Sequence, residues 1–535
     1  MAQVSEAAQA ELHVLDEQEF VARIWQKDPS VWVEPSPGGD PASQTLGWLT
    51  LPDQIADIRG ELAAFADEMC GAGFEDVVLL GMGGSSLGPL VLGEVFGPAE
   101  GYLRLHVLDS TVPGQIKAVQ DRVDLSRTLF LVSSKSGTTV EPLSLYHYFR
   151  KELEQTGSPS PGDHFVAITD PGTALEERAR SDGFRRALNA PEDVGGRFSV
   201  LSPFGLLPAA LLGVDLERLA DGAMAMAAAC GPGSSAADNP GAALGAALGA
   251  HGAAGRDKIT LISSPRLASF GLWVEQLLAE ATGKNGRGIV PGAGEPFYAP
   301  GQYGDDRLFI YTRLQGDENS ASDEHAAALE AAGQPIERID IPDVYSLGAE
   351  FFRWEFAVAV AARALAIYPF DQPDVEAAKQ NARALLEDMA GGVSVPVQGD
   401  IISLVTQVSD GDYVAIAAYL PQSEAVDWAI EGLRSAITGR TGAATTFGYG
   451  PRYLHSTGQL HKGGPASAAV LVLGALDQPE LPVPGADYGF HALFMAQLAG
   501  DVNALRTAGR RITVSGLTGD YAGSIRSMAA AIPGR

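Results

Sequence analysis

Short apolar runs recur along this chain, each followed by a turn rich in glycine, serine, threonine or aspartate and then by a longer helical pattern. The runs in the first half are Asp76–Leu80, Leu103–Leu108, Thr128–Val132 and Phe165–Thr169. This alternation is typical of βαβ units, which build parallel sheets with helices on both faces. Because ligands of such sheets bind at the carboxyl ends of the strands, the four turns are expected to converge on one site.

The same alternation restarts twice further along the chain. A second series comprises the strand-like runs Lys258–Ser263, Arg307–Thr312 and Pro335–Ile341, with a helical pattern at Gly271–Ala281. A third, from about Gly391, comprises Asp412–Leu420, Ala443–Tyr449, Ala468–Gly474 and Arg511–Val514, with helical patterns at Glu424–Ile437 and Tyr488–Thr507. We predict an N-terminal helical segment (1–60), a first α/β domain (61–220), a second (221–390) and a C-terminal α/β segment (391–535). The third series either extends the second sheet or forms a lobe of its own.

The composition is that of an ordinary soluble protein with an acidic balance. Of 535 residues, 46% are hydrophobic, enough to bury cores in two or three domains. The 66 acidic and 37 basic residues give a net charge of −29, which argues against nucleic acid or an anionic membrane as a partner. Two cysteines without metal-ligand spacing, no leader pattern and no apolar stretch of about 18 residues predict a cytoplasmic protein.

Residues 129–142 join a buried strand to a loop suited to an anion. The loop hydroxyls belong to Ser133, Ser134, Ser136, Thr138 and Thr139. Gly137 permits close backbone approach, and a helix starting at Glu141 adds a favourable dipole for a phosphate. The alternative is a turn whose hydroxyls only cap the helix.

A glycine-rich turn, Gly81–Pro89, follows the first predicted strand. Its glycines at 81, 83, 84 and 88 do not follow the strict dinucleotide spacing, and no clear second strand ends in the expected acidic residue. The turn does place Ser85 at a helix N-terminus, which suits a phosphorylated or polyhydroxylated ligand.

Two further segments carry residues suited to charge stabilisation and proton transfer. Arg197 follows two glycines and is permanently charged, so it can stabilise a developing anion; otherwise it is a surface ion-pair residue. Gln276 and Glu280 share one face of a mostly apolar helix. Glu280 is placed to be a general base if that face borders a cleft, and is otherwise a solvated helix end.

Two later segments add polar groups. Gln372 precedes a predicted helix start and Lys379 lies one to two turns inside it, so both can reach one ligand. The loop Tyr449–Pro465 contains His455 and His461 but no nearby carboxylate or cysteine, which favours acid–base work over metal binding.

In sequence order, five of these segments resemble the motifs of the phosphoglucose isomerase family. They are Gly81–Pro89 (Gly-x-Gly-Gly-Ser-x-Leu-Gly-Pro), Ser134–Glu141 (Ser-Lys-Thr-x-Thr-Thr-x-Glu), Val194–Ser199 (Gly-Gly-Arg-[Phe/Tyr]-Ser), Glu280–Lys284 (Glu-Ser-x-Gly-Lys) and Phe370–Lys379 (Phe-Asp-Gln-x-Gly-Val-Glu-x-x-Lys). In the last of these, Asp374 replaces the usual glycine.

One family motif, Thr-Asn-Gly-Gln-His, has no good counterpart between Lys284 and Pro369. A similar segment, Ser456–Gly464, lies instead after Phe370–Lys379, which we call the lysine motif. This order, with Arg23–Pro29 and Leu46–Leu49, resembles the isomerase half of bifunctional transaldolase/phosphoglucose isomerases. The residues before Asp76 are too few for the transaldolase barrel, which needs about 250.

The resemblance implies two sugar-isomerase-type (SIS) three-layer α/β/α domains with parallel sheets plus a C-terminal α/β extension. It also implies reversible isomerisation of glucose 6-phosphate and fructose 6-phosphate without metal or organic cofactor, in a homodimer whose sites can borrow a partner histidine. The implied catalytic residues are Glu280, Arg197, Lys379 and a histidine, His461 or His455. The implied substrate-binding residues are Gly83, Gly84, Ser85, Ser134, Lys135, Ser136, Thr138, Thr139, Gln276 and Gln372.

Three alternatives remain at this point. One is an isomerase that also turns over mannose 6-phosphate. Another is a non-catalytic regulator that binds sugar phosphates, which would not need Glu280, Arg197 and Lys379 together. The third is a nicotinamide dehydrogenase, for which a lone glycine-rich turn is weak support.

Overall fold

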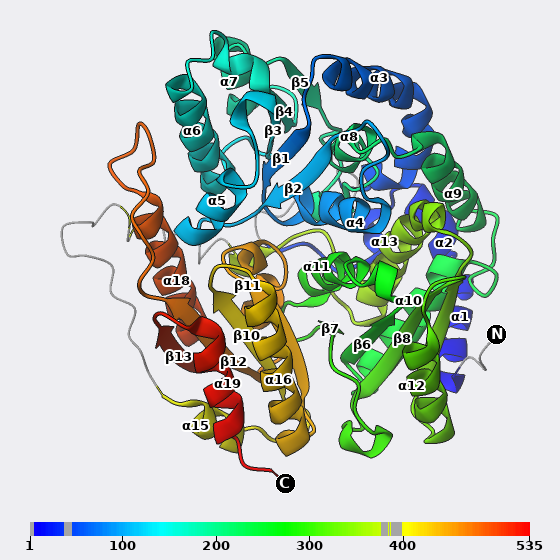
Figure 1. The fold of residues 1–535 in the computed structure, drawn as a ribbon. Helices are drawn as coiled ribbons and strands as arrows, with labels where there is room; N and C mark the ends of the chain where they lie inside the picture. Colours follow the sequence, from blue (N-terminus) through cyan, green and yellow to red (C-terminus); the bar gives the residue numbers. More distant parts are fainter. Residues whose placement is uncertain (1–4, 37–44, 376–383, 385, 387–398, 535) are drawn as a thin grey trace.

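The chain folds into three lobes, each built on its own parallel sheet (Figure 1). The computed structural model describes residues 5–36, 45–375, 384, 386 and 399–534. The parallel α/β architecture expected from the alternating pattern is confirmed. The third series of strands forms a separate sheet and does not extend the second.

The first sheet has the order β2-β1-β3-β4-β5. Its strands are β1 (Asp76–Gly81), β2 (Arg104–Leu108), β3 (Thr128–Ser133), β4 (Phe165–Thr169) and β5 (Arg186–Asn189). The helices of this part of the chain are α3 (Leu51–Gly71), α4 (Leu87–Phe96), α5 (Pro113–Gln120), α6 (Val140–Gln155), α7 (Ala174–Ser181) and α8 (Pro203–Leu211). Every residue of β1, β3 and β4 is buried, as expected for central strands covered on both faces.

The second sheet has the order β7-β6-β8-β9. Its strands are β6 (Lys258–Ser263), β7 (Val290–Ala293), β8 (Arg307–Leu314) and β9 (Ile336–Ile341). The helices of this part, together with the two N-terminal ones, are α1 (Glu6–Glu17), α2 (Phe20–Trp25), α9 (Leu216–Ala229), α10 (Pro240–Ala253), α11 (Phe270–Thr282), α12 (Ser320–Ala331) and α13 (Leu347–Ala364).

The third sheet has the order β11-β10-β12-β13. Its strands are β10 (Tyr413–Tyr419), β11 (Ala444–Tyr449), β12 (Ala468–Ala475) and β13 (Arg511–Leu517). Its helices are α15 (Ile401–Thr406), α16 (Glu424–Thr441), α17 (Gly458–Gly463), α18 (Phe490–Thr507) and α19 (Tyr521–Ala531). Among the described residues, no helix combines the length and apolar character needed to cross a bilayer.

Two edge strands of the structure, β5 and β7, are not predicted from the sequence. Both are four residues long, and β7 contains Pro291 and Gly292, residue types that are depleted in strands. Each lies at the edge of its sheet, where such residues are tolerated because fewer ladder hydrogen bonds are required.

The core of the second lobe depends on close packing between α10 and α13. A side chain at Gly245 would place its Cβ 2.4 Å from the carbonyl oxygen of Ala357, and one at Gly249 would meet Ala364 at 2.5 Å. The alanine- and glycine-rich sequence of α10 is therefore what lets the two helix backbones approach each other.

Helix α13 also carries a buried carboxyl group. Glu355 is fully buried, and neither of its carboxylate oxygens has a hydrogen-bond partner among the described residues. Burial raises the pKa of this carboxyl well above its ordinary value, because the charged form is poorly solvated there. The folded protein thus retains a proton that the unfolded chain loses, and Glu355 lowers stability as the pH rises above the ordinary carboxyl range.

We expect Glu355→Met to stabilise the protein at pH 8 by about 1–3 kcal/mol, because it removes a buried polar group that has no hydrogen-bond partner in the described part of the chain. The gain should be smaller at pH 5, where both states bind the proton more fully. Urea unfolding at the two pH values measures it, with the exposed Glu431→Met on α16 as the control. An equal gain at both pH values would contradict this account of Glu355.

Candidate active site

The glycine-rich turn after β1 lets three distant segments meet. It forms a short 3₁₀ turn, η4 (Gly83–Ser85), in contact with η7 (Gly196–Phe198) and η12 (Arg452–His455). A Cβ at Gly83 would lie 2.2 Å from the His455 carbonyl oxygen, and one at Gly84 would lie 2.0 Å from that of Gly196. Any side chain at either position would therefore push these segments apart.

The hydroxyl loop after β3 is organised by bonds within the loop itself. Ser134 donates to Thr139 at 3.0 Å, and the hydroxyls of Ser136 and Thr138 are also 3.0 Å apart. Gly137 has φ +66°, and a Cβ there would meet the Leu175 backbone nitrogen at 2.9 Å. The loop leads into the N-terminus of α6, so its donors and the helix dipole together suit an anion.

The Lys135 side chain contacts two neighbouring segments of the protein. Its ammonium group pairs with Asp170, which follows β4, and donates to the Glu192 carbonyl oxygen at 3.1 Å. With both contacts made, Lys135 ties the loop to its neighbouring segments, and the loop hydroxyls remain as the groups presented to a ligand.

Glu280 lies near the end of α11 and is held by two donors. Arg197 and Gln276 each donate to its Oε2 at 3.3 Å, which leaves Oε1 as the oxygen able to accept a proton. Burial raises the pKa of the Glu280 carboxyl, against the opposing effect of the Arg197 guanidinium. A desolvated carboxylate with a fixed orientation has the character of a general base.

Arg197 also fixes the turn after α13. Its guanidinium donates to Gln372 Oε1 at 2.8 Å and to the Pro369 carbonyl oxygen at 2.6 Å. From the opposite side, Lys284 donates to Asp371 Oδ1 and to the Tyr368 carbonyl oxygen, both at 2.9 Å. Gln372 is thereby placed beside Arg197 and Glu280, whereas Lys379 lies outside the described residues.

The two candidate histidines occupy different environments. His455 Nε2 is 2.9 Å from Glu141 Oε1, and the His455 carbonyl oxygen accepts from Gln276 at 2.9 Å, so this residue adjoins Glu280 and the hydroxyl loop. His461 is buried in α17, where its Nδ1 lies 3.0 Å from the Tyr413 hydroxyl. Burial lowers the pKa of His461 to about 3, which keeps it uncharged at neutral pH.

Two residues that contact the site, Glu141 and Lys284, are not predicted from the sequence to belong to it. Glu141 lies inside the loop motif, where a carboxylate in the first turn of a helix has an ordinary explanation as a helix-dipole partner. Lys284 is the last residue of the motif Glu280–Lys284. Nothing in the sequence indicates that its side chain holds the turn containing Gln372. Neither could be assigned without the spatial partner.

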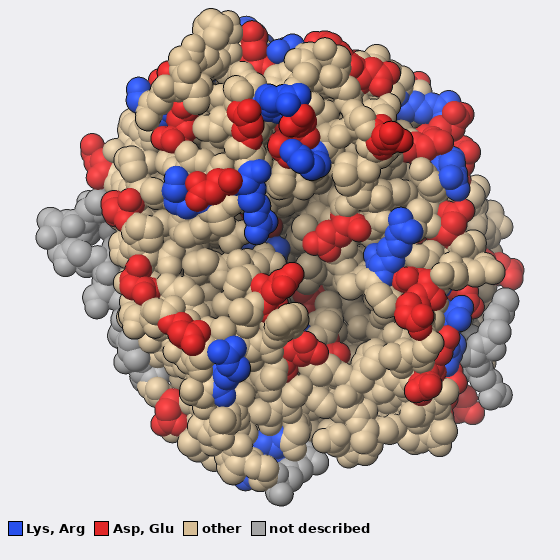
Figure 2. Space-filling view, in the orientation of Figure 1, with Lys and Arg blue, Asp and Glu red and all other residues tan. Residues whose placement is uncertain are grey.

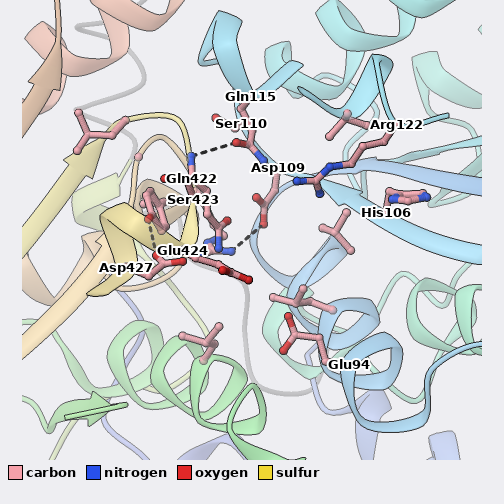
Figure 3. Close-up of a pocket in the computed structure, with 18 of the residues that line it drawn as sticks. Glu94, His106, Asp109, Ser110, Gln115, Arg122, Gln422, Ser423, Glu424 and Asp427 are labelled. Carbon is pink, nitrogen blue, oxygen red and sulfur yellow. Dashed lines mark hydrogen bonds and ion pairs between the residues drawn. The ribbon is translucent and has the colours of Figure 1, made fainter. Parts of the chain in front are cut away.

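A polar cavity of about 360 Å³ adjoins the cluster between β2, α4 and α16 (Figure 3). Asp109, which lines it, accepts from Ser86 at 3.3 Å and lies 3.6 Å from Arg452. Its ionisable lining consists of the carboxyl groups of Glu94, Asp109, Glu424 and Asp427, the guanidinium groups of Arg122 and Arg452, and the His106 imidazole.

This cavity is an unfavourable place for a phosphate. Its lining carries more carboxylates than guanidinium groups, and like charges at short range repel strongly in a partly buried site. Acidic side chains, interspersed with a few basic ones, also lie around the hollow near the centre of this face of the molecule (Figure 2). The hydroxyl loop after β3 is therefore the better anion site.

Comparison with known proteins points to one family. Residues 57–287 match the family model described as phosphoglucose isomerase. A glucose-6-phosphate isomerase from Synechococcus sp. (strain JA-2-3B'a(2-13)) is 31% identical over 59% of this chain and 67% of its own length. A probable glucose-6-phosphate isomerase from Haloquadratum walsbyi is 33% identical over 64% of this chain and 85% of its own length.

Solved structures agree with this fold. A hypothetical protein from Thermus thermophilus superposes with a TM-score of 0.60 at 27% identity, covering 72% of this chain and 97% of that one. A glucose-6-phosphate isomerase from Chlamydia trachomatis superposes with a TM-score of 0.61 at 21% identity, covering 72% and 86%. With relatives of this identity matched over most of their length, the chain belongs to the phosphoglucose isomerase family.

Proposed function

We propose that this protein interconverts glucose 6-phosphate and fructose 6-phosphate. The observation that carries the proposal is the buried Glu280 carboxylate, held on one oxygen by Arg197 and Gln276 and adjoining the His455–Glu141 pair. Such a set of groups suits an aldose–ketose isomerisation, which requires a proton to move between two adjacent carbons beside an oxygen that becomes negatively charged.

The reaction begins with opening of the sugar ring. A proton leaves the anomeric hydroxyl, the bond between the anomeric carbon and the ring oxygen breaks, and a proton reaches the ring oxygen. We assign this exchange to His455, supported by Glu141, with Lys379 as its partner by family resemblance. The assignment favours His455 over His461 because His461 is buried against Tyr413 and stays neutral.

Proton transfer between C2 and C1 follows. Glu280 takes the proton from C2 of the open-chain aldose, which gives a cis-enediol intermediate, and returns it to C1. Arg197 stabilises the negative charge that develops on the enediolate oxygen, and Gln276 and Gln372 orient the sugar hydroxyls. Glu280 thus removes the proton from carbon, and Arg197 stabilises the negative charge that this removal places on oxygen.

The phosphate binds away from the reacting carbons. Ser134, Ser136, Thr138 and Thr139 hold it at the α6 N-terminus, with Ser85 and the backbone of Gly83 and Gly84 from η4. Binding energy gained at this remote group positions the reacting carbons against Glu280. Lys135 contributes through its ion pair with Asp170, which fixes the loop.

We also propose that the chain is similar to the isomerase half of bifunctional transaldolase/phosphoglucose isomerases and that it works in the cytoplasm. The position of the histidine loop after the lysine motif supports the first point. Boundaries near residues 60, 220 and 390 remain our proposal for the domains, and they separate the three sheets. A histidine supplied within one chain makes a borrowed partner residue unnecessary, whether or not the protein forms a dimer.

A coupled assay tests the function. Purified protein with fructose 6-phosphate, in the presence of a chelator, should form glucose 6-phosphate, detected with a glucose-6-phosphate-specific dehydrogenase. Mannose 6-phosphate assayed in parallel measures epimer preference. If no hexose phosphate is converted, the proposed function is wrong.

The two histidines should separate cleanly by mutation. We expect His455→Ala to lower turnover of cyclic substrate about 10²–10⁴-fold, the usual contribution of a general acid–base group. His461→Phe should retain most of the activity, because that ring acts in packing. Steady-state rates with fructose 6-phosphate measure both, and thermal unfolding checks that each variant is folded. The reverse order of effects would move the ring-opening role to His461.

A further inference from the structure

Behind the His455–Glu141 pair lies a third polar side chain that the reaction above does not use. Gln497, on α18 of the third lobe, donates from Nε2 to Glu141 Oε1 at 2.7 Å. Thr111, in the segment after β2, donates to Gln497 Oε1 at 2.6 Å. These contacts form one chain, Thr111–Gln497–Glu141–His455, which joins the first and third lobes.

The hydrogen-bonding roles in this chain are fixed by chemistry. Glu141 Oε1 is a carboxylate oxygen and only accepts, so the group facing it at 2.7 Å must be the amide nitrogen of Gln497. The opposite amide orientation would place two oxygens in contact. The Glu141 carboxylate therefore sets the amide orientation, and the Thr111 hydroxyl, which can rotate to donate, satisfies the amide oxygen.

The chain is shielded from solvent except at the histidine. Thr111 is fully buried, and Gln497 and Glu141 are buried as well, whereas the His455 side chain keeps 14% of its surface exposed. Hydrogen bonds to a charged group are strong in such surroundings, and a carboxylate left without its donor is costly. The contacts of Gln497 therefore affect how Glu141 holds the imidazole.

Apolar side chains fix helix α18 against the first lobe. Phe490 and Leu493 on α18 belong to the core cluster of the first lobe, and the Phe490 ring packs edge-on against Tyr148 of α6 at 5.7 Å. Residues 490, 493 and 497 lie on one helix face. The apolar contacts thus set the position of α18 against α6, the helix whose first turn carries Glu141.

We propose that Gln497 is a positioning residue for ring opening, which orients Glu141 and through it His455, while the hydrogen bond from Thr111 holds the Gln497 amide in place. This inference rests on the proposed function and adds a part of the third lobe to the active site. Gln497 touches neither substrate nor reacting atoms in this role.

Ring opening can be measured separately from isomerisation. Opening and reclosing the ring exchanges the α and β anomers of glucose 6-phosphate without moving the C2 proton, so exchange NMR follows the first step alone. Glu280→Gln should keep this exchange and lose isomerisation. Gln497→Met, which keeps the size but removes the amide, should slow both about 10–100-fold, as expected for a hydrogen bond to a charged group.

Two signatures distinguish positioning from simple packing. The anomer exchange of Gln497→Met should shift its pH profile upward by about one unit, because a carboxylate that has lost a donor draws the shared proton more strongly. Gln497→Glu should regain exchange as the pH falls, since a protonated carboxyl can donate to Glu141 as the amide does. A packing defect would not recover in this way.

Thr111→Val keeps the proposal testable if substitution at Gln497 prevents folding. It should slow anomer exchange several-fold, whereas Thr111→Ser, which keeps the hydroxyl, should not. Thr446→Val on β11, a buried threonine without a described hydrogen-bond partner, is the matched control. Normal exchange in both Gln497→Met and Thr111→Val would overturn the proposal. Anomer exchange without isomerisation by the unmodified protein would overturn only the proposed function, and no exchange at all would overturn both.

Discussion

Replacing Glu280 with glutamine should lower turnover about a thousand-fold or more while sugar-phosphate binding is retained. The amide keeps the size of the side chain and its contacts with Arg197 and Gln276, but it cannot take the C2 proton. The loss should therefore fall on kcat rather than on KM. Steady-state kinetics with fructose 6-phosphate, together with calorimetric binding of a sugar phosphate, measures the two effects separately.

Helix α11 offers a matched control for this substitution. Glu275 is also buried, and burial raises its pKa to about 7, but its Oε1 accepts from the Ala293 backbone nitrogen at 2.8 Å. Glu275→Gln should therefore leave kcat within a few-fold of the unmodified protein. Unchanged turnover in Glu280→Gln, or an equal loss in Glu275→Gln, would exclude Glu280 as the specific base.

Replacing Glu295 with alanine should destabilise the protein by about 3–5 kcal/mol, the cost of leaving a buried charge without its partner. Its carboxylate is fully buried and accepts from Arg307 at 2.6 and 3.2 Å and from the Thr445 backbone nitrogen at 3.0 Å. Burial would raise the pKa of Glu295, but Arg307 outweighs it and holds the pKa below its ordinary value. Urea unfolding at neutral pH measures the loss.

A double substitution that also removes Arg307, the ion-pair partner of Glu295, is the control. Glu295→Met combined with Arg307→Met removes both charges, so the double variant should be more stable than Glu295→Ala alone. Because Glu295 joins β8 of the second sheet to β11 of the third, Glu295→Ala should also lower isomerase activity by displacing η12 and His455. A double variant no more stable than the single one would show that the lost packing, not the stranded charge, causes the effect.

The sequence predicts the elements that are encoded locally. The runs Asp76–Gly81 and Thr128–Ser133 form central strands because their apolar residues are continuous and each is followed by a glycine- or hydroxyl-rich turn. The motifs order these turns along the chain, and the parallel topology then brings η4 and the hydroxyl loop to the same edge of one sheet. Local pattern and topology together suffice for this part of the site.

Contacts between distant segments account for what the sequence leaves undecided. His455 and His461 lie close together in the sequence, and they differ because Glu141, 314 residues away from His455, faces the first and Tyr413 faces the second. Lys135 has the same chemistry whether it is free or paired, and only the arrangement of β3 beside β4 brings Asp170 to it. The choice of partner is a property of the fold and has no local signal.

The dispersal of the cluster along the chain also has a consequence for synthesis. Its residues run from Gly83 in η4 to Gln497 in α18, so contacts across more than four hundred positions must form before the groups meet. Domains fold as the ribosome delivers them, at about 5–20 residues per second, and long-range contacts form late. A nascent chain can complete its first two sheets and still carry an unassembled site, so activity appears only after the chain has been made as far as α18.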